Sequence, residues 1–400
     1  MKTQDEKFDP TTTSLAFQGL WGRVAIHEGL TMTQQAMELH RNDTEKADFV
    51  VLYTHLGTYT AACLRMLVQL SGWRIVLVHD SKLQDIPLPE PRFDDSIVTL
   101  RREDFPSSHK LVELVRRTGA RIVYIAGWSD KDYLCAARIL RSEDRLVICG
   151  CDNQDSGSLR QKLAQRIASW HLHPAIDILW VTGERARQFA WRLGYRGAKC
   201  WTGVYCCDLE GFLQAEPAVA RTPYFLFVGR YVERKGLDVL LAAYRSYRSG
   251  AKEPWKLHCA GAGPLKWMLE GVPGVRDLGF VQPEDLPNLM GACSCFVLPS
   301  RFEAWGVVIQ EAAGAGVPII CSDVVGAASH LLREHFTGWT FSNESVEELT
   351  HAMKYVCSLP EDRRRLMGEN GRALARTYSP ESWARTLLTG CDNWFTQRCS

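Results

Sequence analysis

Residues 294–321 have the sequence SCFVLPSRFEAWGVVIQEAAGAGVPIIC. The stretch begins with a short apolar run at 294–298, which is typical of a strand buried on both faces. A helical pattern follows at 307–315, and a second short apolar run lies at 318–321. Because two strands joined through a helix form a β-α-β unit, this stretch predicts a parallel sheet covered by helices.

The same alternation of strand and helix extends in both directions along the chain. We expect further strands at 49–53, 74–78, 121–125, 146–149, 178–181, 224–228 and 256–260. Helices are expected between them at 60–70, 131–141, 184–193 and 237–247. The pattern therefore predicts an α/β protein with two Rossmann-like, doubly wound parallel-sheet domains that face a central cleft. Ligands of such sheets bind outside the carboxyl ends of the strands.

A polar break at 208–222 divides the alternation into two halves. We therefore predict a first domain at 48–207, a linker at 208–222 and a second domain at 223–378. Ser379, Pro380 and Glu381 form a helix start signal. Residues 379–400 are thus expected to form a C-terminal helix that packs back toward the first domain, whereas the extension at 1–47 suggests no function.

Composition excludes several classes of protein. The 400 residues carry 47 Lys and Arg against 46 Asp and Glu, a net charge of +1, which argues against a dedicated nucleic-acid binder. No run approaches the roughly 20 apolar residues that span a bilayer. The first ten residues lack the apolar core of a signal peptide. The 14 Cys show no zinc-ribbon spacing. We therefore expect a cytoplasmic protein without a structural zinc ion.

Two glutamates flank the start of the expected helix at 307–315. Glu303 and Glu311 are eight positions apart, which corresponds to about 12 Å at 1.5 Å per helical residue. Between them lie Gly306 and the first free N–H groups of the helix, which suit a phosphate. A nucleotide-sugar has this layout, with hydroxyls at both ends and a diphosphate between. The alternative is two solvated glutamates, but Glu311 lies among apolar and small residues, where an unpaired carboxylate is costly.

A second group of candidate residues follows the strand at 224–228, in the sequence FVGRYVERKG at 227–236. Gly229 permits a close turn, Arg230 offers a planar fork for phosphate oxygens, and Lys235 a mobile charge. Both cations can reach a diphosphate at a helix N-terminus. The alternative is an ordinary basic surface loop.

Residues 224–349 resemble the donor half of the family-4 retaining glycosyltransferases of GT-B fold, the glycosyl transferases group 1. The resemblance rests on Gly-Arg with Lys-Gly at 229–236, Gly-Ala-Gly-Pro at 261–264, Leu-Gly-Phe-Val at 278–281, the spaced glutamates, and Gly-Ala-Gly-Val-Pro at 314–318. Ala304 stands where the family often has proline.

The resemblance implies a role for each matching residue. Arg230, Lys235 and Glu303 would be catalytic: the two cations would neutralise the donor diphosphate, and Glu303 would bind sugar hydroxyls. Glu311 would bind the ribose. The remaining donor contacts would come from Gly229, Gly263, the backbone at Val281, and the amides of Trp305, Gly306 and Val307.

The first domain matches the family less closely. Gly57 and Thr58 occupy the first strand–helix turn, where the family has a glycine-rich loop beside the diphosphate. Asp152 and Asn153 follow the strand at 146–149, where the family often places a His or Asp that reaches the donor sugar; the alternative is a helix cap. Trp128 suits stacking on a sugar, and equally suits a buried core position.

Two further features leave alternatives open. Asp130 and Asp132 match the Asp-x-Asp metal signature, but they begin a helix in the wrong architecture, so we expect no metal. Residues 158–170 form an amphipathic helix with an apolar stripe and basic residues beside it. The helix can meet an anionic membrane, but we favour a domain helix whose stripe packs into the core. The stripe is Leu159, Leu163, Ile167 and Trp170, and the basic residues are Arg160, Lys162 and Arg166.

Together these features predict a retaining, metal-independent glycosyltransferase without a cofactor. We expect a nucleotide-diphosphate sugar as donor, with UDP favoured, and a glycan, lipid-linked or small-molecule acceptor. The alternatives are a GDP-sugar transferase and a nucleotide-sugar-binding protein without transfer activity. An oxidoreductase is disfavoured because Gly-x-Gly-x-x-Gly does not occur. Residues 101–204 hold 18 basic and 11 acidic side chains, so an anionic acceptor or peripheral contact with the inner membrane face is one expectation and a soluble acceptor the other.

Overall fold

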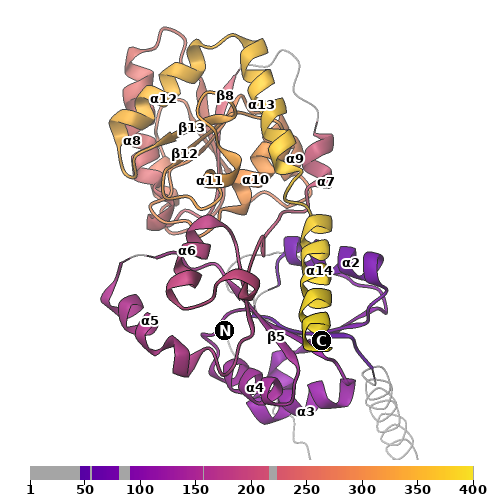
Figure 1. Ribbon diagram of the computed structural model, residues 1–400. Helices are drawn as coiled ribbons and strands as arrows, with labels where there is room; N and C mark the ends of the chain where they lie inside the picture. The colour runs from indigo at the N-terminus through magenta and orange to yellow at the C-terminus, as the bar shows by residue number, and fades with distance from the viewer. Residues whose placement is uncertain (1–45, 55, 81–90, 156, 216–222, 400) are drawn as a thin grey trace, which may run out of the picture. The chain divides into compact units, whose positions relative to one another are not determined.

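The computed structural model describes residues 46–54, 56–80, 91–155, 157–215 and 223–399. The predicted N-terminal extension at 1–47 therefore lies almost wholly outside the described residues, as does the end of the predicted linker. The remainder contains two parallel sheets, each covered by helices (Figure 1).

The first sheet has seven parallel strands in the order β3-β2-β1-β4-β5-β6-β7. Its strands are β1 Phe49–Leu52, β2 Ile75–His79, β3 Ile97–Arg101, β4 Ile122–Ile125, β5 Leu146–Cys151, β6 Ile178–Val181 and β7 Cys200–Thr202. Its helices are α2 Thr58–Ser71, α3 Ser108–Thr118, α4 Lys131–Ser142, α5 Leu159–His171, α6 Glu184–Arg192 and α14 Pro380–Cys399.

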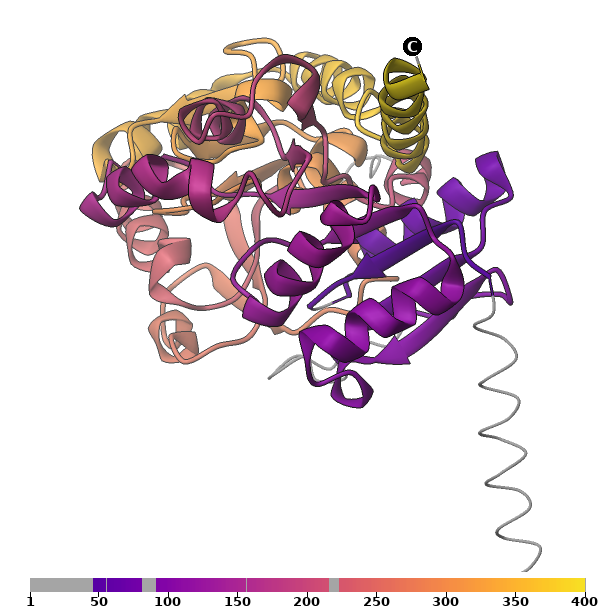
Figure 2. The ribbon, with the colours of Figure 1, turned by 60° about the horizontal axis from the view of Figure 1, so that its bottom comes forward.

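Alternation along the strands builds a separate core on each face of this sheet. Val50 and Leu52 of β1 join the cluster formed with α3, α4 and α6, and Figure 2 shows α3 and α4 in purple along the sheet. Phe49 and Val51 join the other cluster, formed with α2 and α14. Helices on both faces explain why the central strands are apolar throughout.

The second sheet has six parallel strands in the order β10-β9-β8-β11-β12-β13, the same winding as the first. Its strands are β8 Tyr224–Val228, β9 Lys256–Ala260, β10 Val275–Gly279, β11 Cys295–Leu298, β12 Ile319–Ser322 and β13 Gly338–Phe341. Its helices are α8 Leu237–Gly250, α9 Leu286–Gly291, α10 Val307–Gly314, α11 Ala328–Leu331, α12 Val346–Ser358 and α13 Glu361–Ala375. Helix α8 packs on α12, and α10 packs on α9, α11 and α13. The predicted pair of doubly wound sheets is confirmed.

Among the described residues, every strand that the sequence interpretation missed lies at a sheet edge. These strands are β3, β7, β10 and β13. An edge strand has an open side, so it can carry polar residues that hide its apolar pattern. In β10, for example, none of the five residues is buried.

The chain passes from the first sheet to the second at Cys207 and returns to the first domain at Tyr378. The side chain of Gln310 in α10 forms a hydrogen bond with the backbone at both of these points. Its Oε1 accepts a hydrogen bond from the Cys207 N–H at 2.9 Å, and its amide nitrogen donates to the Tyr378 carbonyl. Helix α7, Glu210–Gln214, lies within the predicted linker and buries Phe212.

Helix α14 follows the second crossing and packs on α2 (Figure 1). Trp383 of α14 stacks on Trp180 of β6 with ring centroids 4.8 Å apart. Its Nε1 donates to the Val204 carbonyl at 3.1 Å. The C-terminal helix is thereby fastened to the first domain.

The prediction that the apolar stripe of α5 packs into the core is wrong. The helix forms where expected and Ser158 caps it, but Leu159 is 83% exposed, Leu163 61%, Ile167 42% and Trp170 83%. Ala168 is the only fully buried residue of this helix, and the partly buried Gln161, Ala164 and Gln165 lie on the same face as Ala168. The stripe lies on the opposite face. No helix within the described part of the chain is both long and apolar enough to cross a membrane.

Candidate functional site

The loop after β8 is fixed by a close approach to the loop after β9. The Tyr231 N–H donates to the Ala262 carbonyl at 2.8 Å. Gly263 has φ +151°, and a Cβ there would lie 2.5 Å from the Tyr231 carbonyl oxygen, so a larger residue would displace the backbone. Arg230 is held in this loop with its side chain exposed at the carboxyl end of β8.

Lys235 and Glu303 form an ion pair at the carboxyl ends of β8 and β11. Their side chains are only 11% and 13% exposed, and the Ser300 hydroxyl lies 3.4 Å from the same carboxylate oxygen. Removing either partner would leave the other charge unpaired in a confined place, which is strongly destabilising. A cation can bind a negative group and a carboxylate can bind hydroxyls, so the chemistry of this pair suits a ligand that presents both.

The backbone around Glu303 is anchored from both sides. Arg301 forms a fork on Asp238 at 2.8 and 2.6 Å and also contacts Glu344 at 2.6 Å. The Gly326 N–H donates to the Glu303 carbonyl at 3.0 Å. These contacts hold Glu303 immediately before α10.

Helix α10 begins in a way that leaves its first N–H groups available. Its cap residue, Gly306, has φ +88°, and no side chain caps the helix. The Ile309 N–H donates to the Gly306 carbonyl at 2.9 Å. The N–H groups of Val307 and Val308 come before this bond, so the helix start suits an anion. Trp305 offers only its backbone here, because its ring is buried between His330 and Tyr378 at centroid distances of 5.4 and 5.8 Å.

Glu311 lies one turn further along α10 in a cavity of about 390 Å³. Burial raises the pKa of this carboxyl to about 7. The cavity is also lined by Thr58 and Arg65 of α2, and by Pro283 and Glu284 shortly after Val281. Because hydroxyl groups would relieve the desolvated carboxylate, the cavity suits a ribose. Gly57 caps α2 without a side-chain hydrogen bond, so a second uncapped helix start lies beside Thr58.

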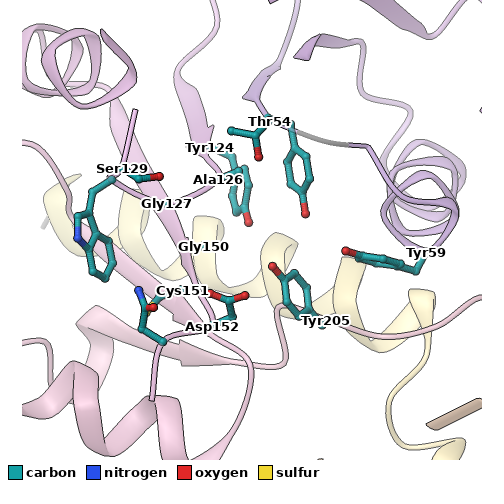
Figure 3. A pocket seen from close by; sticks show the side chains of 13 residues that line it. Thr54, Tyr59, Tyr124, Ala126, Gly127, Ser129, Gly150, Cys151, Asp152 and Tyr205 are labelled. Carbon is teal, nitrogen blue, oxygen red and sulfur yellow. The ribbon is translucent and has the colours of Figure 1, made fainter. Parts of the chain in front are cut away.

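A second cavity, of about 400 Å³, lies at the carboxyl ends of β1, β4 and β5. In Figure 3 the hydroxyls of Tyr59, Tyr124 and Tyr205 point into one shared space above the Asp152 carboxylate. The cavity is lined by Tyr53, Thr54, Tyr59, Tyr124, Ala126, Gly127, Trp128, Ser129, Gly150, Cys151, Asp152, Asn153 and Tyr205.

The sequence predicted three of these lining residues, Trp128, Asp152 and Asn153, but missed the four tyrosines. Desolvation raises the pKa of Asp152, and a hydrogen bond from Tyr205 opposes that shift. Neither Asp152 nor Asn153 caps a helix, because Ser158 caps the next one. The tyrosines were missed because they come from four separate places in the chain, and only the folded sheet brings them together.

Asp130 and Asp132 stabilise the start of α4. The Asp130 carboxylate accepts hydrogen bonds from the Asp132 and Tyr133 N–H groups at 2.8 and 3.0 Å. Both carboxylates lie beside Arg102, at 3.4 and 3.3 Å. This is the helix-start role that the sequence predicted.

Parts of this chain resemble known proteins. Residues 212–374 match the family model of the glycosyl transferases group 1. Over these residues the chain is similar to that family. The α-D-kanosaminyltransferase of Streptomyces kanamyceticus is 31% identical over 175 residues, which are 42% of this chain and 45% of that protein. The O-antigen chain mannosyltransferase B of Escherichia coli is 36% identical over 25% of this chain and 29% of its own length.

The similarity to these curated relatives thus spans less than half of their length. Solved structures resemble this chain over most of its length, and at 14–17% identity the resemblance concerns the fold. Sucrose-phosphate synthase from Thermosynechococcus elongatus matches 88% of this chain and 100% of its own, with a TM-score of 0.68 and 17% identity. HepE of Anabaena, solved with UDP and glucose, matches 86% of this chain and 99% of its own, with a TM-score of 0.66 and 14% identity. The two-sheet fold is therefore GT-B.

Proposed function

We propose that this protein is a retaining glycosyltransferase that moves a sugar from a nucleotide-diphosphate donor to an acceptor bound by the first domain. The observation that carries the proposal is the order of groups at the second sheet. The Lys235–Glu303 pair, the uncapped start of α10 and the desolvated Glu311 follow one another along the chain. A sugar, a diphosphate and a ribose need these groups in this order.

Transfer would proceed by electrostatic stabilisation of the leaving group. As the bond between the sugar C1 and the phosphate oxygen breaks, negative charge grows on the diphosphate. We expect Lys235, Arg230 and the N–H groups at the start of α10 to receive it. This expectation is supported by the exposed position of Arg230 after β8 and by the absence of a side-chain cap on α10. The acceptor oxygen bonds to C1 on the same face, and its proton passes to the departing phosphate oxygen.

The nucleotide is the first property to test. We favour UDP, as bound in the HepE structure, over GDP, which is named for a mycobacterial mannosyltransferase 30% identical over 38% of this chain. A thermal-shift screen of UDP, GDP and their sugar conjugates is direct, because a ligand at 100 times its Kd adds about 2.7 kcal/mol of stability. A higher melting temperature with one nucleotide supports the proposal, whereas no shift with any of them refutes it.

We assign the acceptor to the tyrosine-lined cavity of the first domain. Its described lining contains one carboxylate, Asp152, and no Lys or Arg. Aromatic faces stack on sugar rings, and the phenol hydroxyls and the carboxylate can bind hydroxyl groups. The cavity itself therefore favours a hydroxyl-rich acceptor end over a phosphate. A nucleotide-sugar-binding protein without transfer would need no such second cavity, and measured donor hydrolysis separates the two.

We also propose that α5 docks on an anionic membrane surface. Its exposed stripe combines four large apolar side chains with Arg160, Lys162 and Arg166, which are exposed on the same helix. Burying a Leu-sized side chain contributes about 1.5–3 kcal/mol, and each basic residue near anionic lipid adds about 1 kcal/mol. This surface suits a peripheral enzyme with a lipid-linked acceptor.

Sedimentation with anionic liposomes tests the membrane proposal. Wild-type protein is expected in the pellet at low salt, and the double variant Leu159→Ser, Trp170→Ser in the supernatant. Trp267→Ser is the matched control, because Trp267 is equally apolar and 64% exposed but lies in the second domain. Wild-type protein that stays in the supernatant at low salt would refute membrane docking and leave a soluble acceptor.

A further inference from the structure

One side chain of the first domain reaches the backbone of the donor site. Gln154 follows β5 and is 8% exposed. Its amide nitrogen donates to the Glu303 carbonyl at 2.9 Å and to the Ala304 carbonyl at 2.8 Å. Since a peptide carbonyl can only accept, the amide must present its NH₂ group here, and each of its two hydrogens has a partner.

We propose that Gln154 is a positioning residue that sets the Glu303 carboxylate for the donor sugar. The inference rests on the proposed function. The Glu303 carbonyl accepts two hydrogen bonds, one from the Gly326 N–H within the second domain and one from Gln154 across the domains. Gln154 therefore supplies side-chain hydrogen bonds that couple the sugar-binding loop to the first domain.

The position of the contact decides what it controls. Glu303 and Ala304 immediately precede the turn at Gly306, where α10 begins with free N–H groups. Releasing the two carbonyls would loosen the Glu303 end of the site. It would leave Glu311 unchanged, because that residue is held within the helix. Gln154 should thus affect recognition of the sugar and leave recognition of the nucleotide intact.

The backbone of Gln154 also contacts the exposed helix α5. The Gln161 amide nitrogen of α5 donates to the Gln154 carbonyl at 2.8 Å. The exposed helix and the Glu303 loop are therefore two hydrogen-bonded steps apart. This path gives the first domain a direct physical means of sensing or adjusting the donor-sugar end of the site.

Arg185 provides a matched control. Its guanidinium also joins the two domains, by donating to the Asp323 carbonyl, but it makes no contact with Glu303. Gln154→Met keeps the side-chain volume and removes both hydrogen bonds, whereas Arg185→Ala removes an interdomain contact elsewhere. A mere tether between domains would make the two variants behave alike.

The experiment compares melting temperatures with UDP against UDP-glucose, and with GDP against GDP-mannose. We expect Gln154→Met to keep the rise given by the nucleotide, to lose the additional rise given by the sugar, and to lower kcat at least about tenfold. Arg185→Ala should match wild type in all three. Full retention of the sugar effect in Gln154→Met, or equal losses in both variants, would overturn the inference. A wild-type protein that binds none of the four compounds would instead refute the proposed function and the inference with it.

A second variant covers the case in which Gln154→Met does not fold. Gln154→Glu has the same size, and at pH 8 its carboxylate faces two carbonyl oxygens, whereas a protonated carboxyl at pH 5 can donate one of the two bonds. Measured against wild type at each pH, the sugar effect should be absent at pH 8 and partly restored at pH 5. A ratio to wild type that does not change with pH would contradict the assignment.

Discussion

The carboxyl ends of the two sheets differ in chemistry although the sheets share one winding order. Charged side chains lie at the carboxyl end of the second sheet: Arg230, the Lys235–Glu303 ion pair and the desolvated Glu311. The uncapped start of α10 lies between Glu303 and Glu311 in the chain. The cavity at the carboxyl ends of β1, β4 and β5 is lined instead by phenol hydroxyls, and Asp152 is the single carboxylate in its described lining. The shared topology thus fixes where ligands bind, whereas the loops after each strand decide which ligand binds.

The largest effect on catalysis is expected from the charged residues at the carboxyl end of the second sheet. Lys235→Ala and Glu303→Gln should each lower kcat/KM at least about tenfold, or 1.4 kcal/mol, because each removes a transition-state contact and leaves its partner unpaired. Steady-state kinetics with a matched check of melting temperature measures this. Near-wild-type kinetics in both folded variants would refute the donor-site assignment and the comparison with it.

The second prediction concerns how the stability of Glu311→Gln, compared with wild type, depends on pH. Burial raises the pKa of Glu311 from 4.5 to about 7, so between these values the folded chain holds a proton that the unfolded chain has lost. The stability contributed by that proton is complete below pH 4.5 and disappears as pH rises through 7.

The variant has no such group, so it should become more stable than wild type as pH rises from 5 to 8. At about 1.4 kcal/mol per pKa unit, the difference at pH 8 should be roughly 1–3 kcal/mol. Urea unfolding of both proteins at the two pH values tests this. A constant difference between the proteins would show that Glu311 is not desolvated, and would remove one ground for placing the ribose there.

A smaller effect is expected in the tyrosine-lined cavity of the first domain. Asp152→Asn should raise the acceptor KM about three- to tenfold, the loss of a charge-assisted hydrogen bond, and leave donor hydrolysis by water unchanged. Asp155→Asn is the control, because Asp155 contacts Arg192 and does not line the cavity. Equal effects on hydrolysis and transfer in Asp152→Asn would move this residue from the acceptor to the donor.

The interior of both sheets could be predicted from the sequence, and their edges could not. Central strands such as β1 and β11 are buried on both faces, so their apolar runs stand out. Edge strands such as β10 keep polar residues, which conceal the pattern.

The same division holds for the candidate site. The glutamate spacing and the Gly-Arg and Lys-Gly pairs are local in sequence, so they predict the donor end. Gln154 contacts carbonyls about 150 residues away, and its role depends on backbone atoms that carry no sequence signal. The stripe of α5 shows a further limit, because periodicity reports an apolar face but not the direction in which it points.

The smallest effect concerns divalent metals. We expect EDTA to leave activity largely intact, because Arg230, Lys235 and the start of α10 already supply positive charge for the leaving diphosphate. The matching Asp-x-Asp residues are engaged elsewhere, since Asp130 caps α4 and both carboxylates lie beside Arg102. Within the described residues, no group of three or more His, Cys, Asp or Glu is arranged to hold a metal ion. Complete loss of activity in EDTA, reversed by Mg²⁺ or Mn²⁺ but not by added salt, would contradict this. It would mean that the charged residues of the second sheet need a metal cation that their own side chains do not replace. Asp130→Asn and Asp132→Asn would then be the variants to measure.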